Sequence, residues 1–178
     1  MQTEIIVAGS GGQGVLFAGT LIAQTAIEED KFTTWFPSYG AEMRGGTANS
    51  TVIISNCEIG SPIAAKPNVF LILNEQSYKK FSPRFKAGMT VVINSSLIKT
   101  PTKGPGIKLI PIPATEIADK EIGDVRAANL VMIGAWLRAT DLLALKSAHS
   151  ACKKLFASKP KLIPINQKAL DAGFEYNK

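Results

Sequence analysis

A glycine-rich turn stands between a short apolar run and an amphipathic segment in the first 28 residues. Glu4–Ala8 predicts a short buried strand, and Gly12–Glu28 carries apolar side chains at helical spacing. The turn between them reads Gly-Ser-Gly-Gly-Gln-Gly at residues 9–14, a Gly-x-Gly-x-x-Gly pattern. Because glycines let the chain pass sharply from a strand into a helix, this arrangement predicts a Rossmann-like first βα unit.

Short apolar runs and helical patterns alternate along the rest of the chain. Since such alternation produces parallel sheets, we expect one α/β domain over residues 1–178, three-layered, with a mostly parallel sheet and helices on both faces. The 46% hydrophobic content and 19% charge fit a packed globule. The further strands are predicted at Phe32–Phe36, Thr51–Ser55, Val69–Asn74, Thr90–Asn94 and Leu109–Ile112, and the further helices at Ala127–Ala139, Ser147–Ala157 and Gln167–Ala172.

The glycine loop predicts an anion site. A helix N-terminus presents unpaired N–H groups and glycines allow close approach, so we assign Gly9, Gly11, Gly12, Gln13 and Gly14 to ligand binding. The acidic residue that anchors a nicotinamide ribose is missing from residues 33–38, and the lysine of a P-loop is missing too, which argues against both nucleotide motifs. The same glycines would also suit a tight turn and close helix–strand packing, and this alternative stays open.

Residues 37–49 form the second predicted site, because they are rich in glycine and polar side chains and follow neither a helical nor a strand period. We expect Arg44 to fork onto a phosphate or carboxylate beside Glu42, or else to pair with Glu42 alone. In an open α/β sheet both loops should emerge at the carboxyl ends of the strands. The binding residues predicted in this stretch are Ser38, Tyr39, Glu42, Arg44, Gly45, Gly46 and Asn49.

The sequence offers little for catalysis or metal binding. Cys57 and Cys152 lie far apart, and two thiols cannot hold a four-thiolate iron–sulfur cluster or a structural zinc ion. His149, the only histidine, lies in a helix-like surface pattern without the partners of a catalytic base. We therefore assign no catalytic residue and no metal ligand, and we expect the chain alone to be inactive and to carry neither cluster nor flavin.

The net charge of +6 comes from scattered lysines without interleaved aromatic side chains. This pattern argues against nucleic-acid binding and favours a basic surface that faces an acidic partner subunit. The four apolar residues that follow Glu4 are too few for a signal peptide, and no apolar run is long enough to span a membrane. A cytoplasmic protein without membrane contact is expected.

The two loops together resemble the gamma subunit of 2-oxoacid:ferredoxin oxidoreductases. The resemblance rests on residues 9–14 and on residues 38–50, which read Ser-Tyr-Gly-Ala-Glu-Met-Arg-Gly-Gly-Thr-Ala-Asn-Ser. It covers nearly the whole chain, and its central motif is specific. Further matches are Ile59-Gly60-Ser61-Pro62, Asn94-Ser95-Ser96, Arg126-Ala127-Ala128-Asn129 and Asn166-x-x-Ala169-Leu170-x-x-Gly173.

The resemblance implies a subunit of a multi-chain enzyme that oxidatively decarboxylates a 2-oxoacid. In such enzymes coenzyme A accepts the acyl group and ferredoxin accepts the electrons. Thiamine diphosphate lies between the alpha and beta subunits, and 4Fe-4S clusters lie on partner subunits, which include a ferredoxin-like delta subunit. The gamma domain is associated with coenzyme A and packs on the thiamine-binding core, so the resemblance makes both loops ligand and interface loops.

The form of the central motif looks closest to the relatives that act on 2-oxoglutarate or on branched-chain 2-oxoacids rather than on pyruvate, and we take 2-oxoglutarate as the predicted substrate. Trp35, Phe36, Tyr39 and Met43 lie among glycines, so we expect the isolated chain to self-associate, as in a homodimer, or to depend on its assembly. The alternative function is a free-standing nucleotide- or anion-binding module, which would purify without partners.

Overall fold

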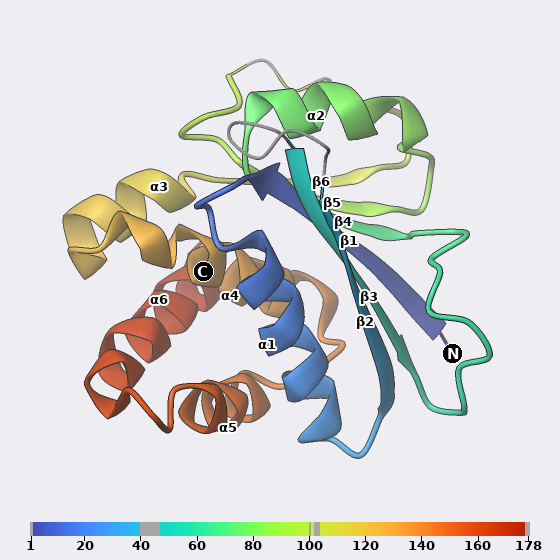
Figure 1. Cartoon of the computed structure of the whole chain (residues 1–178). Coiled ribbons are helices and arrows are strands. Elements are labelled where there is room, and N and C mark those ends of the chain that lie inside the picture. Colours follow the sequence, from blue (N-terminus) through green and yellow to red (C-terminus); the bar gives the residue numbers. More distant parts are fainter. Residues whose placement is uncertain (1, 40–46, 100, 102–103, 177–178) are drawn as a thin grey trace.

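The computed structural model describes residues 2–39, 47–99, 101 and 104–176 (Figure 1). Its strands are β1 (Gln2–Ser10), β2 (Phe32–Tyr39), β3 (Thr47–Ser55), β4 (Val69–Ile72), β5 (Thr90–Asn94) and β6 (Lys108–Ile112). Its α-helices are α1 (Val15–Ile27), α2 (Glu75–Phe81), α3 (Ala114–Ile117), α4 (Ala128–Thr140), α5 (Leu145–Leu155) and α6 (Ile163–Glu175). Short helical turns lie at η1 (Ser82–Arg84), η2 (Ala118–Ile122), η3 (Val125–Ala127) and η4 (Pro160–Leu162).

The strands form one six-stranded mixed sheet in the order β2-β3-β1-β4-β5-β6. The neighbours β1–β4, β4–β5 and β5–β6 are parallel, whereas β3 is antiparallel to both β1 and β2. Five strands therefore share one direction and β3 opposes them. The expectation of a mostly parallel α/β sheet is confirmed, with one antiparallel hairpin that the sequence patterns did not predict.

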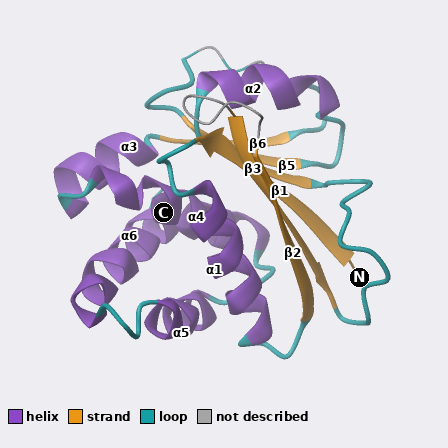
Figure 2. Cartoon of the chain, in the orientation of Figure 1, coloured by secondary structure: helices purple, strands orange, loops and turns teal. Residues whose placement is uncertain are grey.

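Helices cover both faces of this sheet (Figure 2). One face carries α1, α4, α5 and α6, and its apolar core centres on fully buried side chains such as Leu21 and Trp136. The other face carries α2, whose Tyr78 and Phe81 pack with Phe70 of β4. Strands β1, β4 and β5 contribute alternate residues to the two cores, which explains their continuous apolar runs.

The loop predicted at residues 37–49 is shorter in the structure than the sequence indicated. Strand β2 continues to Tyr39 and β3 begins at Thr47, with Ser38 paired to Asn49. Proline has no backbone N–H to donate to a neighbouring strand. Strand β2 tolerates Pro37 because it lies at the edge of the sheet and has a neighbouring strand on one side only. One strand boundary and one helix boundary also differ from the prediction. The apolar run 69–74 ends as a strand at Ile72 and leads into α2, which was not predicted, and α6 is longer than the expected Gln167–Ala172.

Two glycines bring α4 and α6 into close contact. A Cβ atom added at Gly134 would collide with the backbone carbonyl of Leu170, and one added at Gly173 would collide with the carbonyl of Val131. The two helix backbones therefore touch directly. This contact fixes α4, which in turn positions Asn129 and its neighbours beside the glycine loop.

Candidate functional site

The two predicted loops leave the sheet at the same edge. Ser10, the last residue of β1, pairs with Thr47, the first of β3, and Tyr39, the last of β2, pairs with Ala48. The glycine loop therefore begins next to the ends of the hairpin strands, at the carboxyl edge where we expected it. Of the predicted binding residues, Glu42, Arg44, Gly45 and Gly46 lie outside the described residues.

Gln13 and a side chain from a second segment, Asn74, hold the glycine loop in place. Gln13 Oε1 accepts hydrogen bonds from the backbone N–H of Ser10 at 2.7 Å and from Asn74 Nδ2 at 3.0 Å. Asn74 Nδ2 also donates to Ser10 Oγ at 2.5 Å, while its Oδ1 accepts the Ser77 N–H as the N-cap of α2. The start of α2 and the glycine loop are thus fastened by one asparagine.

The glycines of the loop divide into two kinds. A Cβ atom at Gly9 would lie 2.8 Å from Gln13 Oε1, and one at Gly14 would collide with the Asn129 amide, so these two positions serve close packing. Gly11 and Gly12 are exposed, and an added Cβ would meet nothing within 4 Å. Gly12 has a φ of 91°, which disfavours other residues. Packing accounts for the outer glycines, and only the middle pair has room for a neighbouring molecule.

The N-terminus of α1 has no capping side chain. Gly14 occupies the N-cap position with a left-handed conformation, and the first turn carries no acidic residue. Asn129 Nδ2 donates to the Gly14 carbonyl at 2.9 Å, which fixes the cap without using the helix N–H groups. An α-helix leaves its first N–H groups without intrahelical partners, and these attract anions.

A cavity of about 280 Å³ lies beside this helix end. Arg126 lines it and donates to the Asp124 carboxylate through Nε and Nη2, with contacts of 2.8–3.2 Å. This guanidinium lowers the pKa of the Asp124 carboxyl through the hydrogen bond, and Asp124 raises the pKa of Arg126 in return. The Arg126 side chain is still 83% exposed, so it remains open to a further anion. The cavity is also lined by Gly12, Gly14, Phe17, Asn129 and Phe156.

Ser38 and Asn49 belong to a different cavity, of about 470 Å³. It lies on the α2 side of the sheet and is lined by Phe36, Ile63 and Phe81 together with two cations, Lys80 and Arg84. Lys80 Nζ reaches across to Thr47 Oγ1 at 3.0 Å and so links α2 to the hairpin. The structure therefore brings the backbones of the two predicted loops together but places Ser38 and Asn49 in a cavity other than the one beside Gly12 and Gly14.

Sequence reasoning missed the roles of Asn74 and Asn129. The role of Asn74 could have been predicted from the sequence. Asparagine is a preferred N-cap residue, and here it is followed by an acidic residue, Glu75, in the first turn of the helix. The role of Asn129 could not, since its partner Gly14 lies 115 residues away. Over the described residues, no group of three or more His, Cys, Asp or Glu side chains gathers in a metal-binding arrangement. Within the same residues, no helix has the length and apolarity that crossing a membrane requires.

The family model described as pyruvate ferredoxin/flavodoxin oxidoreductase matches residues 4–176. The chain belongs to this family. It is 38% identical over 177 residues to the ketoisovalerate oxidoreductase subunit VorA of Methanothermobacter thermautotrophicus, a match that covers 98% of this chain and 36% of that protein. The chain thus spans about a third of the length of the first curated relatives that it matches.

Other relatives of the family match this chain over most of both lengths. The 2-oxoglutarate synthase subunit KorC of Methanocaldococcus jannaschii is 36% identical over 154 residues, which cover 85% of this chain and 82% of that subunit. The crystal structure of the keto/oxoacid ferredoxin oxidoreductase gamma subunit from Geobacter sulfurreducens superposes with a TM-score of 0.83 at 29% identity, over 97% of this chain and 96% of that one. These matches confirm the resemblance to gamma subunits and the α/β fold.

Proposed function

We propose that this chain is the gamma subunit of a multi-subunit enzyme that oxidatively decarboxylates a 2-oxoacid to an acyl-coenzyme A and passes the electrons to ferredoxin. The observation that carries the proposal is the end-to-end match to a gamma subunit of the same family and fold. The residues of the chain agree with a supporting role. Its only histidine was expected to lack a partner, but it lies 2.7 Å from Asp171 between α5 and α6; it does not line the cavity beside the glycine loop.

In the proposed assembly, thiamine diphosphate and the 4Fe-4S clusters belong to the alpha, beta and ferredoxin-like delta subunits. The gamma chain holds the phosphate-bearing part of coenzyme A at the glycine loop. Support comes from the open space at Gly11 and Gly12, the uncapped N-terminus of α1 and the exposed guanidinium of Arg126 beside one cavity. Each helix N–H end or guanidinium contributes on the order of 1 kcal/mol toward an anion when partly desolvated.

Strand β2 is the proposed contact with a partner subunit. It is an edge strand of eight residues without a charged side chain, and Phe32 and Phe36 are 47% and 52% exposed. Edge strands of monomeric proteins are usually protected by charges, whereas this one presents aromatic side chains and an open row of backbone groups. The same edge would serve a homodimer when the chain is isolated.

The proposed substrate is 2-oxoglutarate, because the central motif looks closest to 2-oxoglutarate or branched-chain relatives and because the KorC relatives are named 2-oxoglutarate synthase subunits. A second candidate is 2-ketoisovalerate, because the VorA relatives share 37–38% identity with this chain. In the proposed assembly the thiamine-binding subunits recognise the 2-oxoacid, so the assay includes both 2-oxoglutarate and 2-ketoisovalerate.

The test is co-expression with the neighbouring subunits, followed by purification on a tagged gamma chain and an assay of coenzyme A-dependent ferredoxin reduction with each 2-oxoacid. Arg44→Ala should raise the Michaelis constant for coenzyme A while the subunits still co-purify. Phe36→Lys should release the partner subunits, whereas Lys153→Ala, an exposed site on α5, should change neither. A chain that purifies without partners is the alternative free-standing module, and wild-type kinetics for Arg44→Ala in an intact assembly would contradict the coenzyme A role.

A further inference from the structure

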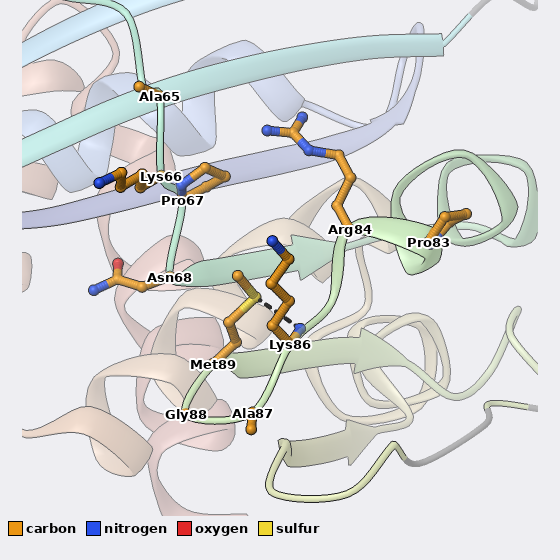
Figure 3. Close-up of a pocket in the computed structure, with 10 residues that line it drawn as sticks. All are labelled: Ala65, Lys66, Pro67, Asn68, Pro83, Arg84, Lys86, Ala87, Gly88 and Met89. Atoms are coloured by element: carbon orange, nitrogen blue, oxygen red, sulfur yellow. Dashed lines mark hydrogen bonds between the residues drawn. The ribbon is translucent and has the colours of Figure 1, made fainter.

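A cavity of about 650 Å³ opens at the amino edge of the sheet, at the end opposite the glycine loop (Figure 3). One wall is the segment that leads into β4 and contains Pro67 and Asn68. The other wall runs from η1 to the start of β5 and contains Arg84, Lys86 and Met89. Pockets that bind small molecules commonly have volumes of about 300–1,000 Å³. The size is therefore that of a small-ligand site.

The charge of the cavity has one sign. Lys66, Arg84 and Lys86 line it, and no acidic residue does. Arg84 and Lys86 extend from their wall toward Pro67 on the other, whereas the Lys66 ammonium points away from them (Figure 3). Two cationic side chains thus line one cavity, and Arg84 also lines the neighbouring 470 Å³ cavity.

Carboxylates do not neutralise this pair. In the part of the chain that the structure describes, Arg84 and Lys86 form no ion pair, although Lys79 nearby pairs with Glu75. The acidic side chain beside the opposite wall is Glu4, and its carboxylate already accepts the Lys66 backbone N–H and the Gln2 amide. An anion entering the cavity would therefore meet two available cations.

The wall that carries the cations is held in shape. The backbone N–H of Lys86 donates to Met89 Sδ at 3.1 Å, and the Gly88 N–H donates to the Gly106 carbonyl at 2.8 Å. The Arg84 guanidinium lies 5.8 Å from the centre of the Phe81 ring, a distance at which a cation is attracted to the ring face. Asn68 is likewise fixed, because its Oδ1 accepts the Glu4 N–H at 3.0 Å. The backbone of the two walls therefore needs little ordering when a ligand binds, whereas the exposed side chain of Lys86 becomes ordered on the ligand.

We propose that this cavity binds a small organic phosphate at a site separate from the glycine loop. The Arg84 guanidinium forks onto two phosphate oxygens and the Lys86 ammonium meets the third, while the organic body lies against Pro67 and Met89. A phosphomonoester fits better than a monocarboxylate, because its two negative charges and three terminal oxygens match a fork and a point charge together. This site does not depend on the proposed coenzyme A role.

The test is an NMR titration of the full chain with AMP, with adenosine, inorganic phosphate and succinate as further probes. Residues 65–68 and 84–89 should shift with AMP, and adenosine should leave them unchanged. The double variant Arg84→Gln, Lys86→Gln should bind AMP at least about tenfold more weakly. A matched double variant that removes two exposed lysines elsewhere, Lys153→Gln with Lys161→Gln, should bind AMP as the wild type does.

Three outcomes would overturn the proposal. Equal losses in the two double variants would show a response to net charge alone. Succinate that shifts the same residues as strongly as AMP would make the cavity a carboxylate site. The third outcome is a raised Michaelis constant for coenzyme A in the assembled enzyme that carries Arg84→Gln and Lys86→Gln. It would place coenzyme A in this cavity and contradict a separate phosphate site, whatever Arg44→Ala does to the same constant.

Discussion

Replacing Asn74 should loosen the glycine loop without touching it. The Asn74 amide donates to Ser10 Oγ and to Gln13 Oε1, and its oxygen caps α2 through the Ser77 N–H at 2.8 Å. Asn74→Ala removes all three contacts. Gln13 Oε1 then keeps only the Ser10 N–H, and the segment between β1 and α1 loses its link to the neighbouring strand.

The magnitude follows from the three contacts. Loss of an asparagine N-cap costs about 1 kcal/mol, and each of the two further hydrogen bonds contributes about 1 kcal/mol. Asn74→Ala should therefore lower the free energy of unfolding by about 3 kcal/mol. Asn74→Asp keeps an oxygen that caps the helix and loses only the donors, so its cost should be about 2 kcal/mol. The difference between the variants measures the cap.

Urea unfolding followed by circular dichroism gives the two free energies, and amide hydrogen exchange of residues 10–14 reports on the loop itself. Both variants should exchange faster there than the wild type, whereas only the alanine variant should also expose the first turn of α2. An alanine variant with wild-type stability and wild-type exchange at residues 10–14 would refute the idea that Asn74 fastens the loop.

Three further outcomes are expected. Gly173→Ala should lower the free energy of unfolding by about 2 kcal/mol, because its methyl group collides with the Val131 carbonyl and overpacking outweighs the gain in helix propensity; Gly11→Ala, with open space around it, is the control in the same urea experiment. Hydrogen bonds from Lys154, Ser150 and Gln24 lower the pKa of Glu28 from 4.5 to about 2, so its contribution to stability is full above pH 4.5 and is lost as the pH falls toward 2. The stability difference between wild type and Glu28→Gln should accordingly shrink over that range, and a difference that stays constant there would contradict the assignment. Burial raises the pKa of the Cys152 thiol to about 11, whereas Cys57 is exposed, so a thiol reagent at pH 8 should modify one cysteine per native chain and two in urea.

The first βα unit could be predicted from local sequence because its determinants are local. The apolar run, the glycines and the helical spacing lie within 28 residues, and β1 and α1 appear where those patterns place them. The β2–β3 hairpin could not be predicted in this way. Its strands continue into residues 37–39 and 47–49 because β3 pairs with β1 along its whole length, from Gln2 with Ser55 to Ser10 with Thr47. That register depends on residues about 45 positions away in the chain.

The candidate site shows the same limit. The glycines signalled a turn, but the local sequence could not show that Gly14 is a packed position, since the atoms around it come from Asn129, 115 residues later. Gly9 is packed partly by its neighbours Gln13 and Val15 and partly by the distant Leu73. The direction of the Gln13 side chain likewise depends on Asn74, 61 residues later. The roles of Gly11, Gly12 and Gln13 toward a ligand stay predictions.

Three asparagines connect segments at the carboxyl edge of the sheet through hydrogen bonds. Asn74 follows β4, Asn94 ends β5 and donates to the Leu73 carbonyl and to Thr115, and Asn129 opens α4 and donates to the Gly14 carbonyl. An asparagine side chain offers a hydrogen-bond donor and an acceptor without net charge, so it can satisfy backbone groups of two segments at a buried turn. Asn94 and Asn129 are buried in this way, with at most 3% of each residue exposed. A loop fixed in this way loses little conformational entropy when a ligand or subunit binds it, and the smaller entropy loss makes binding tighter.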